Sequence, residues 1–210
     1  MKMKTYLALA VLLPAIAGAD GYYAASWAAY GTYANYGVPD VHSQLTPARS
    51  TSMASGDFNG DGVQDLVASF TTGGVWAYDT VAATWSQIHG AAADYGVAVG
   101  DLNGDGIDEV FMARSVGGVS KYDFTTSLTT TVNPNAADKI ATGDLDGNGT
   151  DEIVMSFTGA GLGTYAYYGA TAVKISSAHA GQLATGDIDG DGNDEVFFSF
   201  SGFGTYVNQG

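Results

Sequence analysis

Four copies of a nine-residue acidic segment recur along the chain at nearly constant spacing. They read DFNGDGVQD, DLNGDGIDE, DLDGNGTDE and DIDGDGNDE, at residues 57–65, 101–109, 144–152 and 187–195. Their first residues are 44, 43 and 43 positions apart. A period of about 20 to 50 residues is typical of repeat architectures, in which each unit buries its apolar face by stacking on its neighbours. The fold must therefore be built from copies of one supersecondary unit.

Short segments of alternating apolar residues flank each acidic segment. SMASG, GVAVG, KIATG and QLATG precede it, and DLVASF, EVFMAR, EIVMSF and EVFFSF follow it. A third segment begins at Gly74, Gly118, Gly163 and Gly204, and a fourth follows in most units. This pattern, with 30 Gly and 14% charged residues, indicates strands joined by tight turns. Four strands in about 43 residues predict an all-β chain of propeller blades, with a β-solenoid as the alternative.

The beginning of the chain also belongs to the repeat, although it has no acidic segment. Residues 22–37 are similar to residues 152–169 after a small gap. The hairpin that follows the acidic segment thus occurs five times, and the other two strands of the unit occur four times. We expect about four to five four-stranded blades, one of them incomplete within the chain. The unpaired strand edges that result would favour a homo-oligomer or filament formed by strand pairing.

Residues 1–19 have the pattern of a signal peptide. Lys2 and Lys4 precede an apolar run, and Ala17 and Ala19 form an A-x-A cleavage site. The run is too short for a membrane anchor and contains Pro14, so we expect a secreted or cell-surface protein with no membrane insertion after cleavage. Residues 20–210 would then form a single calcium-binding repeat domain. The chain has no Cys, so an exported form must be stabilised by something other than disulfides.

The charge of the chain indicates cations as its ligands. The full chain has 22 acidic and 7 basic residues, and loss of Lys2 and Lys4 changes its formal charge from -15 to -17. Such a surface repels a phosphate backbone, so nucleic acid is excluded as a partner. Sixteen of the 22 acidic residues lie in the four acidic segments, where uncompensated carboxylates would repel one another. Four calcium ions would reduce the charge to -9 and would couple metal binding to folding.

The acidic segments have the pattern of loops that bind a hard cation. Oxygen side chains stand at positions 1, 3, 5 and 9, a Gly stands at position 6, and position 7 can offer a backbone carbonyl. The loops resemble EF-hand loops through position 9. The Glu expected at position 12 is replaced by Ala68, Met112, Met155 and Phe198, and strands flank the loops. Ordinary solvated hairpin turns are the alternative interpretation.

The repeated D-x-[DN]-G-[DN]-G-x-x-[DE] loop resembles the FG-GAP or VCBS repeats of integrin-α-like β-propellers. The resemblance covers nearly all of residues 20–210 and implies about four Ca²⁺ ions, one per loop. It implies side-chain ligands at Asp57, Asn59, Asp61, Asp65, Asp101, Asn103, Asp105, Glu109, Asp144, Asp146, Asn148, Glu152, Asp187, Asp189, Asp191 and Glu195. It implies backbone carbonyl ligands at Val63, Ile107, Thr150 and Asn193. Such propellers commonly have seven blades, more than this chain supplies.

Binding or assembly, and not catalysis, is the function that this pattern favours. His42, His89 and His179 fall at unrelated phases of the repeat, and the clustered carboxylates already belong to the loops. We expect a structural or adhesive surface component that self-assembles by completion of an incomplete blade. The alternative is a lectin-like module, in which aromatic residues off the repeat phase hold a glycan or contact a surface protein. These residues are Tyr23, Tyr36, Tyr168 and Trp85.

Overall fold

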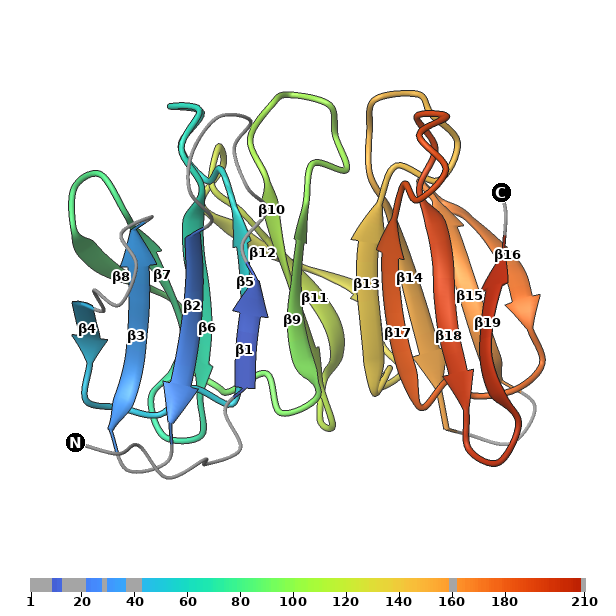
Figure 1. Cartoon of the computed structure of the whole chain (residues 1–210), viewed down its shortest axis with the longest axis horizontal. Helices are drawn as coiled ribbons and strands as arrows, with labels where there is room; N and C mark the ends of the chain where they lie inside the picture. The colour runs from blue at the N-terminus through green and yellow to red at the C-terminus, as the bar shows by residue number, and fades with distance from the viewer. Residues whose placement is uncertain (1–8, 13–21, 28–29, 37–42, 159–161, 209–210) are drawn as a thin grey trace.

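The chain is all-β (Figure 1). The structure, a computed structural model, describes residues 9–12, 22–27, 30–36, 43–158 and 162–208. This part of the chain contains no helix, and so none that is long and apolar enough to cross a membrane. The described strands form five antiparallel sheets, four with four strands and one with three.

Each sheet contains strands that are consecutive in sequence, and each strand pairs with the next. The first sheet contains β1 (Leu9–Leu12), β2 (Tyr22–Trp27), β3 (Gly31–Tyr36) and β4 (Ser43–Thr46). The second contains β5 (Ser52–Gly56), β6 (Asp65–Phe70), β7 (Gly74–Asp79) and β8 (Thr84–His89). The third contains β9 (Gly96–Gly100), β10 (Glu109–Arg114), β11 (Gly118–Asp123) and β12 (Leu128–Asn133). The fourth contains β13 (Lys139–Gly143), β14 (Glu152–Phe157), β15 (Gly163–Tyr168) and β16 (Thr171–Ser176). The last contains β17 (Gln182–Gly186), β18 (Glu195–Phe200) and β19 (Gly204–Asn208).

The sheets are arranged as the blades of an open propeller. Their first strands lie in one row, in which β5 contacts β9, β9 contacts β13 and β13 contacts β17, while β1 contacts β5. Figure 1 shows the sheets side by side in chain order, and they do not close into a ring. The prediction of about four to five blades, one of them incomplete, is confirmed. The solenoid alternative is wrong, because each repeat forms its own antiparallel sheet.

The core lies between neighbouring sheets, and the second strand of each inner sheet contributes to the core on both faces. All six residues of β6 are buried, as are all six of β14. On β6, Leu66 packs toward Ala24 of the first sheet, whereas Val67 packs toward Met112 of the third. These strands are apolar at successive positions because a neighbouring sheet covers each face. Position 12 of the loop pattern falls on these strands, which explains why it holds a buried residue such as Met155 and not a ligand.

A serine near the end of the second strand joins successive repeats. The hydroxyls of Ser26, Ser69 and Ser156 each accept a hydrogen bond from a backbone N–H 24 residues later, at 3.0, 3.0 and 2.8 Å. The residue after each of these serines is aromatic, and Phe70 and Phe157 are buried. Phe200 of the last sheet is half-buried, and the side chain of Trp27 lies outside the described residues. The bond fixes the entry of the next repeat at three of the four junctions, whereas the third sheet has Ala113 at this position.

The surroundings of the glycine that begins each third strand differ between sheets with and without a fourth strand. Gly31, Gly74, Gly118 and Gly163 have positive φ, and a Cβ on each would overlap a carbonyl oxygen at the end of the fourth strand. Only glycine tolerates both conditions. Gly204 also has positive φ, but no atom lies within 4 Å of the corresponding Cβ position. In the first sheet, β1 falls inside the predicted signal peptide, so residues 20–210 would supply that sheet with three strands.

Candidate metal centres in the acidic loops

The four acidic segments connect the first strand to the second strand in the last four sheets. They follow β5, β9, β13 and β17 and lie at the same end of the molecule, at the top of Figure 1. The glycines at positions 4 and 6 all have positive φ, between 70° and 96°. This left-handed backbone turns the chain sharply twice within each loop. Side chains at alternate positions can therefore point toward a common centre.

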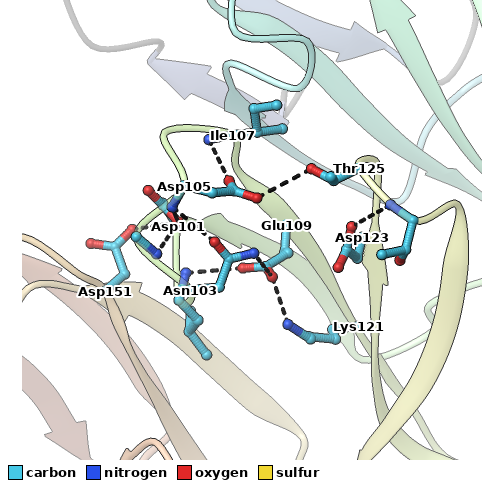
Figure 2. Close-up of polar contacts among 12 residues, drawn as sticks. Asp101, Asn103, Asp105, Ile107, Glu109, Lys121, Asp123, Thr125 and Asp151 are labelled. Atoms are coloured by element: carbon cyan, nitrogen blue, oxygen red, sulfur yellow. Dashed lines mark hydrogen bonds and ion pairs between the residues drawn. The ribbon is translucent and has the colours of Figure 1, made fainter.

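Hydrogen bonds inside the loops hold the oxygen side chains in place, as Figure 2 shows for the second loop. Asp101 Oδ1 accepts the Gly104 N–H at 2.7 Å, and Asp101 Oδ2 accepts the Gly106 N–H at 2.8 Å. Asn103 Oδ1 accepts the Asp105 N–H at 2.8 Å, and Asp105 Oδ1 accepts the Ile107 N–H at 2.9 Å. Corresponding bonds to position 1 occur in the other three loops. Backbone N–H groups of the loop thus orient the side chains at positions 1, 3 and 5.

The carboxylates converge most closely in the third and fourth loops. Asp144, Asp146 and Glu152 each place an oxygen within 4.8 Å of the other two. Asp187, Asp189 and Glu195 do the same. These residues hold positions 1, 3 and 9. At position 5, Asp191 lies outside the carboxylate group of the fourth loop, and the third loop has the amide Asn148.

The remaining predicted ligands belong to the first two loops and to position 7. In the first two loops position 3 is Asn, so an amide would complete the oxygen set there. At position 7, Val63, Ile107, Thr150 and Asn193 donate their N–H to the position 5 side chain. These bonds involve the N–H and not the carbonyl of each residue, so the role of the four carbonyls as ligands stays a prediction.

Position 9 places a carboxylate inside the protein. Asp65, Glu109, Glu152 and Glu195 are at most 4% exposed, as residues. The three glutamates accept the N–H of position 2, at distances of 2.9 to 3.1 Å. Asp65 has a shorter side chain and accepts the Thr80 N–H at 2.9 Å. Burial raises the pKa of Glu152, and the charges of Asp146 and Asp144 raise it further. A bound cation would favour the charged carboxylate and so lower the pKa of Glu152.

A lysine on a neighbouring strand pairs with the position 9 carboxylate of the second loop. Lys121 on β11 places Nζ 2.5 Å from Glu109 Oε1, and Asn103 Nδ2 donates to the same oxygen at 2.9 Å (Figure 2). The corresponding third-strand residues in the other acidic-loop sheets are Ala77, Ala166 and Val207. Sequence reasoning missed this ion pair. The signal was a single Lys in a strand position that is otherwise apolar.

Position 8 was also missed, and it links each loop to the one before it. The Asp108 N–H donates to the Asp57 carbonyl at 2.9 Å, and Asp108 Oδ2 accepts the Asp57 N–H at 2.7 Å. Asp151 makes the same two bonds to Asp101, at 2.8 and 2.9 Å. Burial raises the pKa of Asp151 to about 6, and nearby Asp108 adds to the shift. The signal in the sequence was Asp at position 8 in three of the four loops.

The donor set suits a hard divalent cation. Every side chain that converges in the third and fourth loops offers a carboxylate oxygen, and calcium takes six to eight oxygen ligands at about 2.3 to 2.6 Å. Glu152 and Glu195 are buried, and neither takes part in an ion pair among the described residues. The second loop fits less well, because Lys121 already neutralises Glu109. Chemically, the arrangement can hold an ion and join two strands through it.

Comparisons with known proteins identify the repeat and the fold. Residues 57–112 match the family model of the FG-GAP-like repeat. No match was found among curated proteins.

Two solved structures are similar to the whole described chain. The crystal structure of BBS1N in complex with ARL6DN, soaked with lead, superposes with a TM-score of 0.69 at 10% identity, over 95% of this chain and 64% of that chain. The same complex soaked with mercury gives a TM-score of 0.67 at 8% identity, over 94% and 63%. This chain thus spans just under two thirds of the proteins it resembles. Residues 57–112 are thus similar to the FG-GAP-like repeat, and the chain has the fold of an open β-propeller.

Proposed function

We propose that the protein is an exported, calcium-stabilised β-propeller that acts by binding or assembly and not by catalysis. The convergence of Asp187, Asp189 and Glu195, repeated in the third loop by its three equivalents, carries this proposal. A turn that served only to reverse the chain would have no reason to bury a carboxylate at position 9. Fold likeness alone would not decide function, because propellers host many activities.

Calcium would stabilise the fold by holding the first and second strand of each sheet together. Glu195, for example, is the first residue of β18, and Asp187 directly follows the end of β17. An ion bound by both residues would close the start of that strand pair. Binding to the folded state alone adds about 2.7 kcal/mol per site when free calcium is 100 times the dissociation constant. Extracellular calcium modules often bind in the range of about 0.1 to 1 mM, so the surroundings would control stability.

The last sheet offers the surface for assembly. The third strand, β19, has no fourth strand beside it in the described structure, and four of its five residues are exposed. Tyr206 is 48% exposed, Val207 is 46% exposed, and Phe203 in the preceding turn is 78% exposed. Gly204 keeps the conformation and the free space that a fourth strand needs. We propose that a strand of a second copy pairs here, which would build an oligomer or filament at the cell surface.

Protein binding by this fold has support from the similar structure, since BBS1N was crystallised in complex with ARL6DN. A catalytic role has less support. His179 Nε2 lies 2.5 Å from Asp138 Oδ2, yet no described hydrogen bond joins a hydroxyl nucleophile to either side chain. His89 contacts Arg114, and His42 lies outside the described residues. The clustered carboxylates belong to the loops.

Size-exclusion chromatography with light scattering, in calcium and after chelation, tests the proposal on residues 20–210. We expect a folded oligomer in calcium and a lower unfolding temperature, by circular dichroism, after chelation. Tyr206→Lys with Val207→Lys should give a calcium-bound monomer, because charged residues on an edge strand block strand addition. Leu128→Lys is the matched control, since Leu128 is 59% exposed on the outer strand of a complete sheet. A monomer indifferent to chelation would contradict both parts of the proposal.

A glycan-binding role is the second candidate, and one groove favours it. Tyr78, Thr80, Trp85 and Gln44 line this groove, together with Ser43, Leu45 and Ala83. Trp85 packs against Tyr78 with ring centroids 4.9 Å apart and is half-buried. Tyr168 is half-buried and packs against the core between the last two sheets, and the side chains of Tyr23 and Tyr36 lie outside the described residues. Glycan-array binding that Trp85→Ala abolishes without unfolding the protein would support this candidate.

A further inference from the structure

The aspartates at position 8 connect the acidic loops into a chain. Asp108 holds both backbone groups of Asp57, and Asp151 holds both backbone groups of Asp101. The third junction repeats the backbone part, because the Asp194 N–H donates to the Asp144 carbonyl at 2.6 Å. In every case the residue held is position 1 of the preceding loop.

Each of these aspartates stands beside predicted ligands of two different loops. Asp151 precedes Glu152, the position 9 carboxylate of its own loop, and it contacts Asp101 of the loop before it. Figure 2 shows Asp151, which belongs to the third loop, beside Asp101 of the second loop. A movement of Asp101 toward an ion must therefore shift Asp151, and with it the peptide bond to Glu152. No predicted ligand set includes position 8, so this contact serves something other than coordination.

The glycine before each loop makes room for this contact. A Cβ on Gly56, Gly100 or Gly143 would overlap the carboxylate of Asp108, Asp151 or Asp194, respectively. At Gly186, the equivalent residue of the last sheet, nothing lies within 4 Å. The glycine before one loop and the position 8 aspartate of the next loop therefore form a joint between repeats. A single loop does not need this joint.

The position 8 aspartate is missing from the first acidic loop. The first acidic loop has Gln64 at position 8, and the sheet before it has no acidic segment in the sequence. An aspartate is thus present at position 8 in each loop that follows another acidic loop. A general requirement of the hairpin would place it in all four.

We propose that Asp108, Asp151 and Asp194 are positioning residues that couple the loops, so that calcium in one loop raises the affinity of its neighbour. This inference rests on the proposed calcium binding. When the preceding loop is empty, its position 1 residue is held only by the loop's own hydrogen bonds and by the position 8 aspartate. An ion orders both partners of the joint, and the next ion then binds a loop whose start is already fixed. Coupling between sites typically changes affinity by about 5-fold or more.

Calcium titration by isothermal calorimetry, on residues 20–210, tests the coupling with three variants. The wild type should bind more steeply than independent sites allow. Asp151→Ala should keep the number of ions while losing steepness, because the hydrogen bond from the Asp101 N–H to the Asp151 carboxylate is removed and only the backbone bond remains. Asp151→Asn keeps an acceptor oxygen and should restore most of the steepness. Gln64→Ala, at the same loop position without an acidic predecessor, should behave as the wild type.

A second measurement remains informative if Asp151→Ala does not fold. Asp146→Ala with Glu152→Gln removes one ligand of the third loop and the charge of a second, and leaves Asp151 in place. Hydrogen exchange of the loop amides against calcium should then show the second loop bound about 5-fold or more weakly, and the first loop less affected. Independent isotherms in the wild type, or an unchanged second loop in this variant, would overturn the coupling alone. Absence of any calcium binding would instead overturn the proposed function and the coupling with it.

Discussion

The ion pair between Lys121 and Glu109 makes the second loop different, and Lys121→Ala reveals what it contributes. The Glu109 side chain is 2% exposed and the Lys121 side chain is 25% exposed, with Nζ and Oε1 2.5 Å apart. Removing one partner of a buried pair costs about 3 to 5 kcal/mol, because the other charge stays buried. Lys121 is partly solvated, and Leu102 and Asn103 also donate to Glu109, so the lower end applies.

We therefore expect Lys121→Ala to lower the free energy of unfolding by about 3 kcal/mol in chelator, which is about 6 to 12 °C in Tm for a chain of this size. Saturating calcium should shrink the loss to the roughly 0.5 kcal/mol typical of surface substitutions, because the ion replaces the ammonium beside Glu109. Urea unfolding followed by circular dichroism, with chelator and with calcium, measures both values.

Lys174→Ala is the control, since it removes the same charge from an exposed position on β16, where Nζ lies 5.4 Å from the centroid of the Tyr165 ring. It should lower stability by about 0.5 to 1 kcal/mol, and by the same amount in both conditions. An equal loss for Lys121→Ala with and without calcium would refute the reasoning, because it would mean that no ion reaches Glu109.

Three further outcomes can be checked by the same unfolding assay. Met155→Ala should cost about 2 to 5 kcal/mol, because the Met155 side chain is fully buried between two sheets, whereas Val116→Ala, at a residue 85% exposed, should cost about 0.5 kcal/mol or less. Gly118→Ala should destabilise more than Gly204→Ala, since both have positive φ but only Gly118 lies against a fourth strand; equal losses would remove the packing argument. In chelator, stability should rise as the pH falls from 7 toward 4.5, because the folded pKa of Asp151, about 6, lies above its usual 3.8 and the charged form is penalised as pH rises through 6. Asp151→Asn should flatten that dependence, and a rise in stability with pH in the calcium-free wild type would contradict it.

Much of the fold was predictable because the chain repeats. The spacing of the loops and the alternation around them predicted the strands, and counting hairpins predicted that one blade would be incomplete. The oxygen residues at positions 1, 3 and 9 could also be predicted, since local turn geometry brings them together. Repetition allowed every local signal to be read four times, so chance patterns could be set aside.

The sequence alone thus determined the repeat unit, its strands and its acidic loops, because each depends on contacts within about 43 residues. The tertiary structure decided how the units meet. The joint between Asp151 and Asp101 spans 50 residues, and it forms only because neighbouring sheets bring their loops to the same end. Lys121 reaches Glu109 through the pairing of β10 with β11, which sets the side chain on the face of the loop. The open face of the last sheet likewise depends on how the blades stack, since burial is decided by the neighbour and not by the strand itself.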